Sequence, residues 1–239
     1  IPHPATVSIG EAVPPDTPGY KFRLILSEMA ADTESIPSEQ EFPIHTQFAR
    51  MARKHPFGKI FCEYDGTTWK EHRNFTLLVK AVLLSREIRK MTDHDCKYVG
   101  VMLPNTSTVA VVVLAILMAD KTPAILNFTA SKDAVKAAME KADLTCVLTS
   151  KRFLSKINFE PLPEMFMLEN LAGKIPKFRQ LAYTFLTALL PSRELMNIIS
   201  PLSYNDVQRT LVVIYSSGSS GQPKGVMLSH HNINSNIYS

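Results

Sequence analysis

The chain has 239 residues, of which 45% are hydrophobic and 20% charged, and its formal net charge is +4. This composition is typical of a globular protein of one or two domains with enough apolar residues for a core. The charge is too small for this length to indicate a nucleic-acid partner. The three cysteines, Cys62, Cys96 and Cys146, form no CxxC pair, which argues against a disulfide framework or a zinc site and favours a reducing compartment.

The two ends of the sequence lack the features of a complete chain. Residue 1 is Ile rather than Met, and no signal-peptide pattern follows it. The longest apolar run, 109–119, is about half the roughly 20 residues that a membrane-spanning helix needs. We expect that both ends are cut within larger elements, so that the sequence is a piece of a longer protein.

The N-terminal part is too small to form a core. Residues 5–13 alternate like a strand and end at a proline-rich corner, and a helix is expected from residue 18 or 19 to residue 31. One strand and one helix cannot bury a core by themselves. The polar stretch that follows reads as a linker. We therefore divide the chain into a tail (1–31), a linker (32–43) and a main domain (44–239).

The main domain opens with a helix and a hairpin. A helix is expected over 44–54, with Ile44, Phe48 and Met51 on one face. Residues 59–64 read as a strand, and Asp65-Gly66 is a hairpin turn signal before a return strand that contains Trp69, which we expect to pack in the hairpin. A long helix is expected over 74–90.

Strands and helices then alternate. The strands are expected over 98–105, 123–128 and 145–150, with helices over 107–119 and 131–141, the second of which Ser131 or Thr129 would cap. Strands that alternate with helices of ten or more residues indicate an α/β fold with a mostly parallel sheet covered on both faces. Cys146 falls in the last strand, where we expect it to be inert.

Residues 178–190 form a strongly apolar segment that we expect to be a helix, and a shorter one is expected over 194–199. Basic residues flank the longer helix, and no acid lies between Lys174 and Arg193. Such a helix can lie in a membrane interface, or it can be an amphipathic helix that packs on the sheet. Both interpretations stay open.

The most informative segment is 211–226. Residues 211–214 predict a buried strand, which stops at a loop of Ser and Gly followed by Pro223 and Lys224. Such a loop can surround phosphate oxygens with backbone N–H groups and hydroxyls, while Lys224 supplies a positive charge. A Walker A loop is excluded, because here Lys precedes Gly and no hydroxyl residue follows. The predicted phosphate-binding residues are Ser216, Ser217, Gly218, Ser219, Ser220, Gly221, Lys224 and Gly225.

Other residues of this region have structural interpretations. We expect Tyr215 and Met227 in the core. His230 and His231 begin the next helix pattern, and adjacent histidines rarely share a face, so we expect helix N-terminal packing or exposure rather than a metal site.

The pattern Tyr-Ser-Ser-Gly-Ser-Ser-Gly-x-Pro-Lys-Gly-Val over 215–226 resembles the phosphate-binding signature of the adenylate-forming superfamily. The usual form has Thr where this chain has Ser216 and Ser220. Residues 59–150 resemble the opening of the same enzymes, in particular 101–105 and 122–129, which are similar to the synthetase half of bifunctional acyl-carrier-protein synthetase/2-acylglycerophosphoethanolamine acyltransferases. One departure is Asp120, where the family usually has Gly and where we expect an altered turn.

Residues 1–31 resemble the end of a glycerolipid acyltransferase domain. That family has a His followed five residues later by Asp, and no His of this chain has Asp at that offset. The acyltransferase chemistry would therefore precede Ile1. The order of tail, linker and synthetase-like domain is also that of the fused proteins.

The resemblance implies an enzyme that uses ATP and Mg²⁺ to convert a fatty acid into an acyl-adenylate and then into a thioester on acyl carrier protein or CoA. The fused acyltransferase would pass the acyl group to a lysophospholipid, on the cytoplasmic side of a membrane that 174–193 could contact. No catalytic residue is assigned within this sequence. The family's later elements would follow Ser239, so we expect the 239-residue chain alone to have no turnover.

Two alternatives stay open. The chain could belong to another ligase of the superfamily that activates an aryl or amino acid, because most of the acid-binding pocket would lie outside it. It could also be a non-catalytic binding or scaffold protein that kept the loop as a turn. The neighbouring coding sequence on both sides would distinguish these possibilities.

Overall fold

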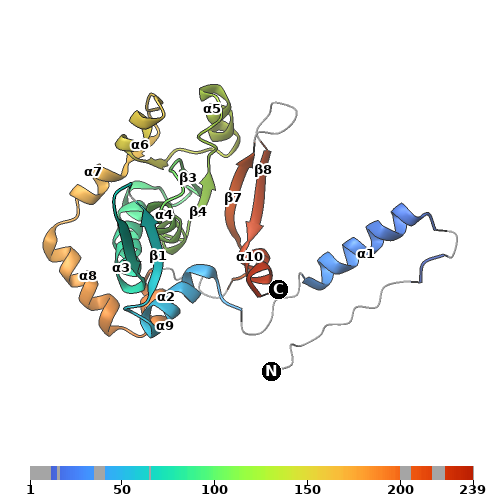
Figure 1. Ribbon diagram of the computed structural model, residues 1–239, viewed down its shortest axis with the longest axis horizontal. Helices are drawn as coiled ribbons and strands as arrows, with labels where there is room; N and C mark the ends of the chain where they lie inside the picture. Colours follow the sequence, from blue (N-terminus) through green and yellow to red (C-terminus); the bar gives the residue numbers. More distant parts are fainter. Residues whose placement is uncertain are drawn as a thin grey trace. The chain divides into compact units, whose positions relative to one another are not determined.

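The computed structural model of the protein describes residues 12–14, 17–34, 41–64, 66–199, 206–216 and 224–238. The chain divides into two compact units, which are described separately (Figure 1). The larger unit is Phe42–His230, and the smaller one combines Ile1–Glu41 with His231–Ser239. Within the described residues, no helix is both long enough and apolar enough to cross a membrane.

A six-stranded sheet forms the centre of the larger unit. Its spatial order is β6 (Met165–Met167), β5 (Val147–Thr149), β3 (Tyr98–Val101), β4 (Thr122–Ile125), β7 (Thr210–Ser216) and β8 (Lys224–Ser229). Neighbouring strands are parallel except at the end, where β8 runs antiparallel to β7. The predicted α/β fold with a mostly parallel sheet is confirmed.

Helices cover both faces of this sheet because its strands are apolar on both sides. Val99 and Val101 of β3 belong to a core formed with α2 (Ile44–Lys54), α3 (Asn74–Met91) and α4 (Ser107–Met118). Met102 and Val147 face a second core, which includes residues of α5 (Lys132–Lys141) and α6 (Lys151–Lys156). Three more helices lie on the side of the first core: α7 (Leu168–Gly173), α8 (Lys177–Leu189) and α9 (Ser192–Ile199).

A separate two-stranded hairpin joins α2 to α3. Strands β1 (Lys59–Tyr64) and β2 (Trp69–Arg73) pair antiparallel, so the predicted hairpin is confirmed. Gly66 adopts φ +97° in the turn, a conformation that favours glycine. Trp69 is 69% exposed and lies opposite Tyr64, with the two ring centres 5.3 Å apart.

The smaller unit contains α1 (Gly19–Glu34) and most of α10 (His230–Tyr238). The helix expected to end at residue 31 continues to Glu34, so it extends into the stretch that the sequence assigned to a linker. The strand predicted over 5–13 falls mainly outside the described residues.

Three residues that the sequence placed in apolar faces are exposed. Met51 of α2 is 36% exposed, because the buried face of this helix carries His45, Phe48 and Ala52 instead. Ile214 of β7 is 41% exposed, so only part of the predicted buried strand is buried, and Met227 of β8 is 54% exposed. Both lie at the end of the sheet that extends beyond α4 and α5 (Figure 1).

Four elements were not predicted from the sequence: α6, β6, α7 and β8. The first three fall in a stretch without clear periodicity. Strand β8 follows the Gly-Ser loop directly, where the sequence had predicted no strand before the next helix.

Candidate phosphate-binding site

The predicted phosphate-binding loop connects two paired strands at one edge of the sheet. Strand β7 ends at Ser216 and β8 begins at Lys224, and these two residues are partners in the antiparallel register. Strands β3, β4 and β7 are parallel, so their carboxyl ends lie at this same edge. In open α/β sheets ligands bind outside the carboxyl ends of the strands, so Ser216 and Lys224 lie where the fold favours a binding site.

The predicted site residues divide into two groups. Ser216, Lys224 and Gly225 lie in the described strands, and Lys224 is exposed. Ser217, Gly218, Ser219, Ser220 and Gly221 lie outside the described residues. The structure therefore brings the two ends of the loop together, and phosphate binding by both groups of residues stays a prediction.

Gly225 leaves room for the ring of Tyr215 on the neighbouring strand. A Cβ atom at residue 225 would lie 3.1 Å from Cγ1 of Val213 and 3.2 Å from Cε1 of Tyr215. Tyr215 is 8% exposed, which agrees with its predicted place in the core. Burial raises the pKa of Tyr215, and the nearby Tyr98 raises it further. This packing fixes the start of β8, and with it the backbone of Lys224.

Polar residues that the sequence analysis did not select lie at the same edge. Asn105 and Thr106 follow β3, and Asn127 and Thr129 follow β4. Oδ1 of Asn127 accepts hydrogen bonds from the backbone N of Thr129 at 3.0 Å and from its hydroxyl at 2.8 Å, which orders this turn. Asn105 and Asn127 fall within the predicted strands 98–105 and 123–128, which in the structure end at Val101 and Ile125.

The two histidines after β8 are buried, as expected for packing at the start of a helix. Nδ1 of His230 accepts a hydrogen bond from the backbone N of Ile44 at 3.1 Å, and its ring centre lies 5.4 Å from that of His45. Within the smaller unit, Nδ1 of His231 lies 2.8 Å from Oε2 of Glu41. In the part of the chain that the structure describes, no group of three or more His, Cys, Asp or Glu side chains is placed to hold a metal ion.

The sequence that forms this sheet and the two strands at its end matches a known family. The family model described as "AMP-binding enzyme" matches residues 48–239, which is most of the chain. The chain belongs to the AMP-binding enzyme family. The match begins within α2 and includes the whole sheet and the loop between β7 and β8.

Curated relatives and solved structures support this family assignment. The nonribosomal peptide synthetase gloA of Glarea lozoyensis is 23% identical over 199 residues, which are 83% of this chain and 2% of that protein. VinN solved with 3-methylaspartate aligns with a TM-score of 0.62 and 16% identity over 83% of this chain and 51% of that chain.

Two further solved structures share this fold. The fatty acid AMP ligase from Legionella pneumophila aligns with a TM-score of 0.61 and 18% identity over 81% of this chain and 32% of that chain. The O-succinylbenzoate coenzyme A synthetase from Bacillus subtilis, solved with ATP and magnesium ion, aligns with a TM-score of 0.57 and 16% identity. The alignment covers 78% of this chain and 43% of that chain. At these identities the structures show a shared fold, and this chain spans about half or less of each of them.

Proposed function

We propose that this chain is part of an ATP-dependent ligase that activates a fatty acid as an acyl-adenylate. A carboxylate oxygen of the acid forms a bond to the α-phosphorus of ATP, and the bond from that phosphorus to the bridging oxygen of the β-phosphate breaks. Pyrophosphate leaves with the electron pair. The membership in the AMP-binding family carries this proposal.

In this reaction the loop between β7 and β8 would bind the β- and γ-phosphates. Lys224 is exposed at the carboxyl edge of the sheet, and the serine hydroxyls and backbone N–H groups of 217–222 would add donors. Donors that are already in place stabilise the negative charge that moves onto the leaving pyrophosphate. Mg²⁺ would neutralise part of the phosphate charge. Since the described residues contain no metal-binding cluster, no ligand for it is assigned within them.

Two classes of acid remain candidates. The similarity to a fatty acid AMP ligase and the sequence resemblance to acyl-carrier-protein synthetases favour a fatty acid. The similarity to a nonribosomal peptide synthetase and to VinN, which was solved with 3-methylaspartate, favours an amino acid as the second candidate. We retain the fatty acid, with acyl carrier protein or CoA as the thiol acceptor.

The proposal extends to the N-terminal tail. Its resemblance to the end of an acyltransferase domain and the order of tail, linker and synthetase favour a fused acyltransferase that transfers the acyl group to a lysophospholipid. In the described part of the tail, α1 exposes Tyr20, Phe22, Leu24 and Leu26. Their spacing of two residues places them on two opposite sides of the helix, so apolar side chains on both sides are suited to packing against further protein.

Calorimetric titration of the 239-residue chain with ATP tests the role of the loop without requiring turnover. We expect Lys224→Ala to weaken ATP binding by about tenfold or more, since it removes a charge-assisted contact. Lys80→Ala, which removes an exposed lysine of α3, is the matched control and should bind like the wild type. Equal ATP affinity of Lys224→Ala, Ser219→Ala and the wild type would contradict the proposal.

Pyrophosphate exchange by the intact parent protein tests the substrate. Exchange that depends on a fatty acid supports the proposal, whereas exchange that depends on an amino acid supports the second candidate. In the same assay the Lys224→Ala/Ser219→Ala double variant should lose about 100-fold or more in rate, because removing one such donor typically costs about 3 kcal/mol of barrier.

A further inference from the structure

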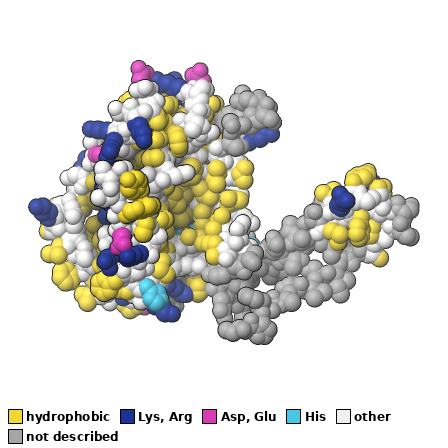
Figure 2. Space-filling model, in the orientation of Figure 1, with side chains coloured by type: hydrophobic (Ala, Val, Ile, Leu, Met, Phe, Trp, Pro, Cys, Tyr) yellow, Lys and Arg dark blue, Asp and Glu magenta, His cyan; other side chains and the backbone are white. Residues whose placement is uncertain are grey.

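The outer side of α8 carries a row of exposed apolar side chains. Phe178, Leu181, Phe185 and Leu189 are 70%, 59%, 57% and 76% exposed. Their spacing of three or four residues places them on one side of the helix. Figure 2 shows apolar side chains along the edge of the larger unit where α8 lies in Figure 1. We call these four residues the α8 stripe.

The opposite side of α8 holds the helix in this orientation. Thr187 is buried, and Tyr183 packs against the core that α2, α3 and α4 share. The guanidinium of Arg53 in α2 donates hydrogen bonds to the backbone oxygens of Thr187 and Ala188. The α8 stripe therefore points away from the core as a consequence of the packing of the larger unit.

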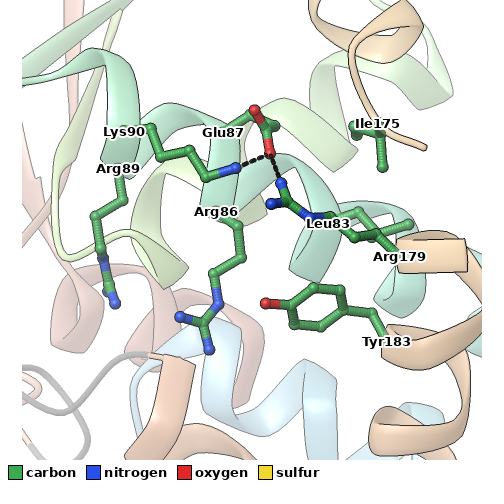
Figure 3. Close-up of a pocket in the computed structure, with 8 residues that line it drawn as sticks. All are labelled: Leu83, Arg86, Glu87, Arg89, Lys90, Ile175, Arg179 and Tyr183. Carbon is green, nitrogen blue, oxygen red and sulfur yellow. Dashed lines mark hydrogen bonds and ion pairs between the residues drawn. The ribbon is translucent and has the colours of Figure 1, made fainter.

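Positive charge accompanies the α8 stripe. Lys174 and Lys177 are exposed just before and at the start of the helix, and the sequence has no acid from Lys174 to Arg193. A cavity of about 260 Å³ lies between α3 and α8 (Figure 3). Its lining contains four cations, which are Arg86, Arg89, Lys90 and Arg179, and one acid, Glu87. The remaining lining residues are uncharged: Leu83, Ile175 and Tyr183.

Acids contact three of the four cations of this cavity, since Arg89 pairs with Asp120 and the other two share Glu87. Glu87 accepts a hydrogen bond from Lys90 and lies 3.8 Å from Arg179, as the dashed lines in Figure 3 indicate. The guanidinium carbon of Arg86 lies 5.6 Å from the centre of the Tyr183 ring, and its buried Nε has no hydrogen-bond partner in the described part of the chain. The cavity therefore retains a donor that suits an anion such as a phosphate group.

We propose that the α8 stripe docks this protein on a membrane surface that contains anionic phospholipids. The Phe and Leu side chains would enter the boundary between headgroups and acyl chains, and α8 would lie parallel to the surface. Lys174 and Lys177 would extend their charged ends to lipid phosphates, and the cavity beside Arg86 would face the headgroups. No described helix is suited to crossing the bilayer, so the contact would be interfacial.

The combination of features favours a lipid surface over a protein partner. An apolar stripe alone would fit either, but here the lysines and arginines near it outnumber the acids, and the two acids beside the cavity, Glu87 and Asp120, are already engaged with its cations. Each lysine near an anionic surface strengthens binding by about fivefold. This inference does not depend on the adenylation chemistry, so either proposal can fail while the other holds.

Flotation of the 239-residue chain with vesicles tests the proposal. We expect binding to vesicles that contain phosphatidylglycerol, weaker binding to phosphatidylcholine alone, and loss of binding at high salt. Phe185→Glu/Leu189→Glu should lower the partition coefficient by about tenfold or more, and Lys174→Gln/Lys177→Gln by about 25-fold. Circular dichroism of each variant checks that it is folded.

A matched control uses exposed apolar residues at the other end of the sheet. Val226 and Met227 of β8 are 50% and 54% exposed, so Val226→Glu/Met227→Glu makes the same chemical change away from α8. This variant should float like the wild type. Equal loss of binding in both double variants would overturn the assignment to α8, as would the absence of any lipid binding by the wild type.

A fluorescence reporter gives an independent measurement. Trp69 is the single tryptophan, so Phe185→Trp in a Trp69→Phe background reports on α8 alone. We expect a blue shift on addition of anionic vesicles, and no shift for Met227→Trp in the same background. Concentration-dependent dimers that disappear in Phe185→Glu/Leu189→Glu, together with no blue shift on vesicles, would overturn the proposal in favour of a second copy of the chain.

Discussion

Nη2 of Arg89 in α3 donates a hydrogen bond to Oδ2 of Asp120 at 2.9 Å, at the turn that ends α4. Asp120 has φ +61°, and the backbone N of Asp120 and Lys121 donate to the oxygens of Leu117 and Ile116. These two bonds form the Schellman motif, in which glycine is usual at the left-handed position. The guanidinium of Arg209, just before β7, also donates to the backbone oxygen of Asp120. One aspartate therefore connects α3, the end of α4 and the chain that enters β7.

Replacement of Asp120 should separate the effect of the ion pair from that of the backbone. We expect Asp120→Ala to lower the free energy of unfolding by about 2 kcal/mol or more, since it removes the acceptor of Arg89 and places a Cβ residue without a local hydrogen bond in the left-handed region. Urea unfolding measures this loss. Asp120→Gly also removes the ion pair, but glycine adopts the left-handed conformation without strain, so this variant should lose less stability than Asp120→Ala. Equal stability of Asp120→Ala and the wild type would contradict this account.

The same residue shows what a sequence can and cannot predict. The absence of glycine at 120 suggested an altered turn, yet the structure keeps the turn, because Asp tolerates the left-handed region better than most residues. Helices α5 and α6 are also followed by left-handed residues other than glycine, Asp143 and Asn158. The tolerance of Asp and Asn for the left-handed region explains these turns once the structure is known. Asp and Asn are also common in ordinary loops, so the sequence alone does not predict such a turn.

The alternation of strands and helices from Tyr98 to Thr149 was sufficient to predict a mostly parallel sheet. Strands that are apolar on both faces and separated by helices occur almost only in sheets of this kind. It could not predict how β7 joins the sheet beside β4, since that pairing depends on residues far apart in the sequence. The loop motif predicted a phosphate site, which stays a prediction, and the structure adds that Ser216 and Lys224 are partners in the strand register. Asn127 was not selected because the predicted strand extended to residue 128, whereas β4 ends at Ile125 and leaves Asn127 in the turn at the strand edge.

Cys146 and Cys62 should differ strongly in reactivity. Burial raises the pKa of Cys146 to about 12, with a further increase from Cys96, whereas Cys62 is exposed on β1. The thiolate is the reactive form. At pH 8 we expect a thiol reagent to modify Cys62 in the native protein and Cys146 only after unfolding. The Cys62→Ser variant leaves only the thiols of Cys96 and Cys146 to react, so their slower modification can be measured directly. Rapid modification of Cys146 in the folded variant would disprove the prediction.

Gly100 in β3 should not tolerate a larger side chain. A Cβ atom there would lie 2.7 Å from Cγ2 of Val147 and 3.1 Å from Cδ1 of Leu144, both in the core. We expect Gly100→Ala to lower the free energy of unfolding by about 1–3 kcal/mol. Gly173→Ala is the control, because no atom lies within 4 Å of its Cβ position, and it should be neutral or stabilising by up to about 1 kcal/mol. If the contact with Val147 causes the loss, Gly100→Ala/Val147→Ala should lose less than the sum of the single variants.

Stability should fall between pH 7 and pH 5 because of two buried histidines. Burial lowers the pKa of His45 to about 3, with contributions from His230 and Arg209, and burial lowers that of His230 to about 4, with a contribution from Arg209 that Asp206 opposes. Below about pH 6.5 the unfolded chain binds protons that the folded chain does not, so the free energy of unfolding decreases as the pH falls. At pH 5 the loss reaches up to about 2 kcal/mol for each histidine, and above pH 7 the effect disappears.

Urea unfolding at pH 5, 6 and 7 measures this slope of stability against pH. The slope should be shallower in His45→Gln and unchanged in His94→Asn, whose side chain is 97% exposed. The same slope in His45→Gln as in the wild type would show that other groups cause the pH dependence.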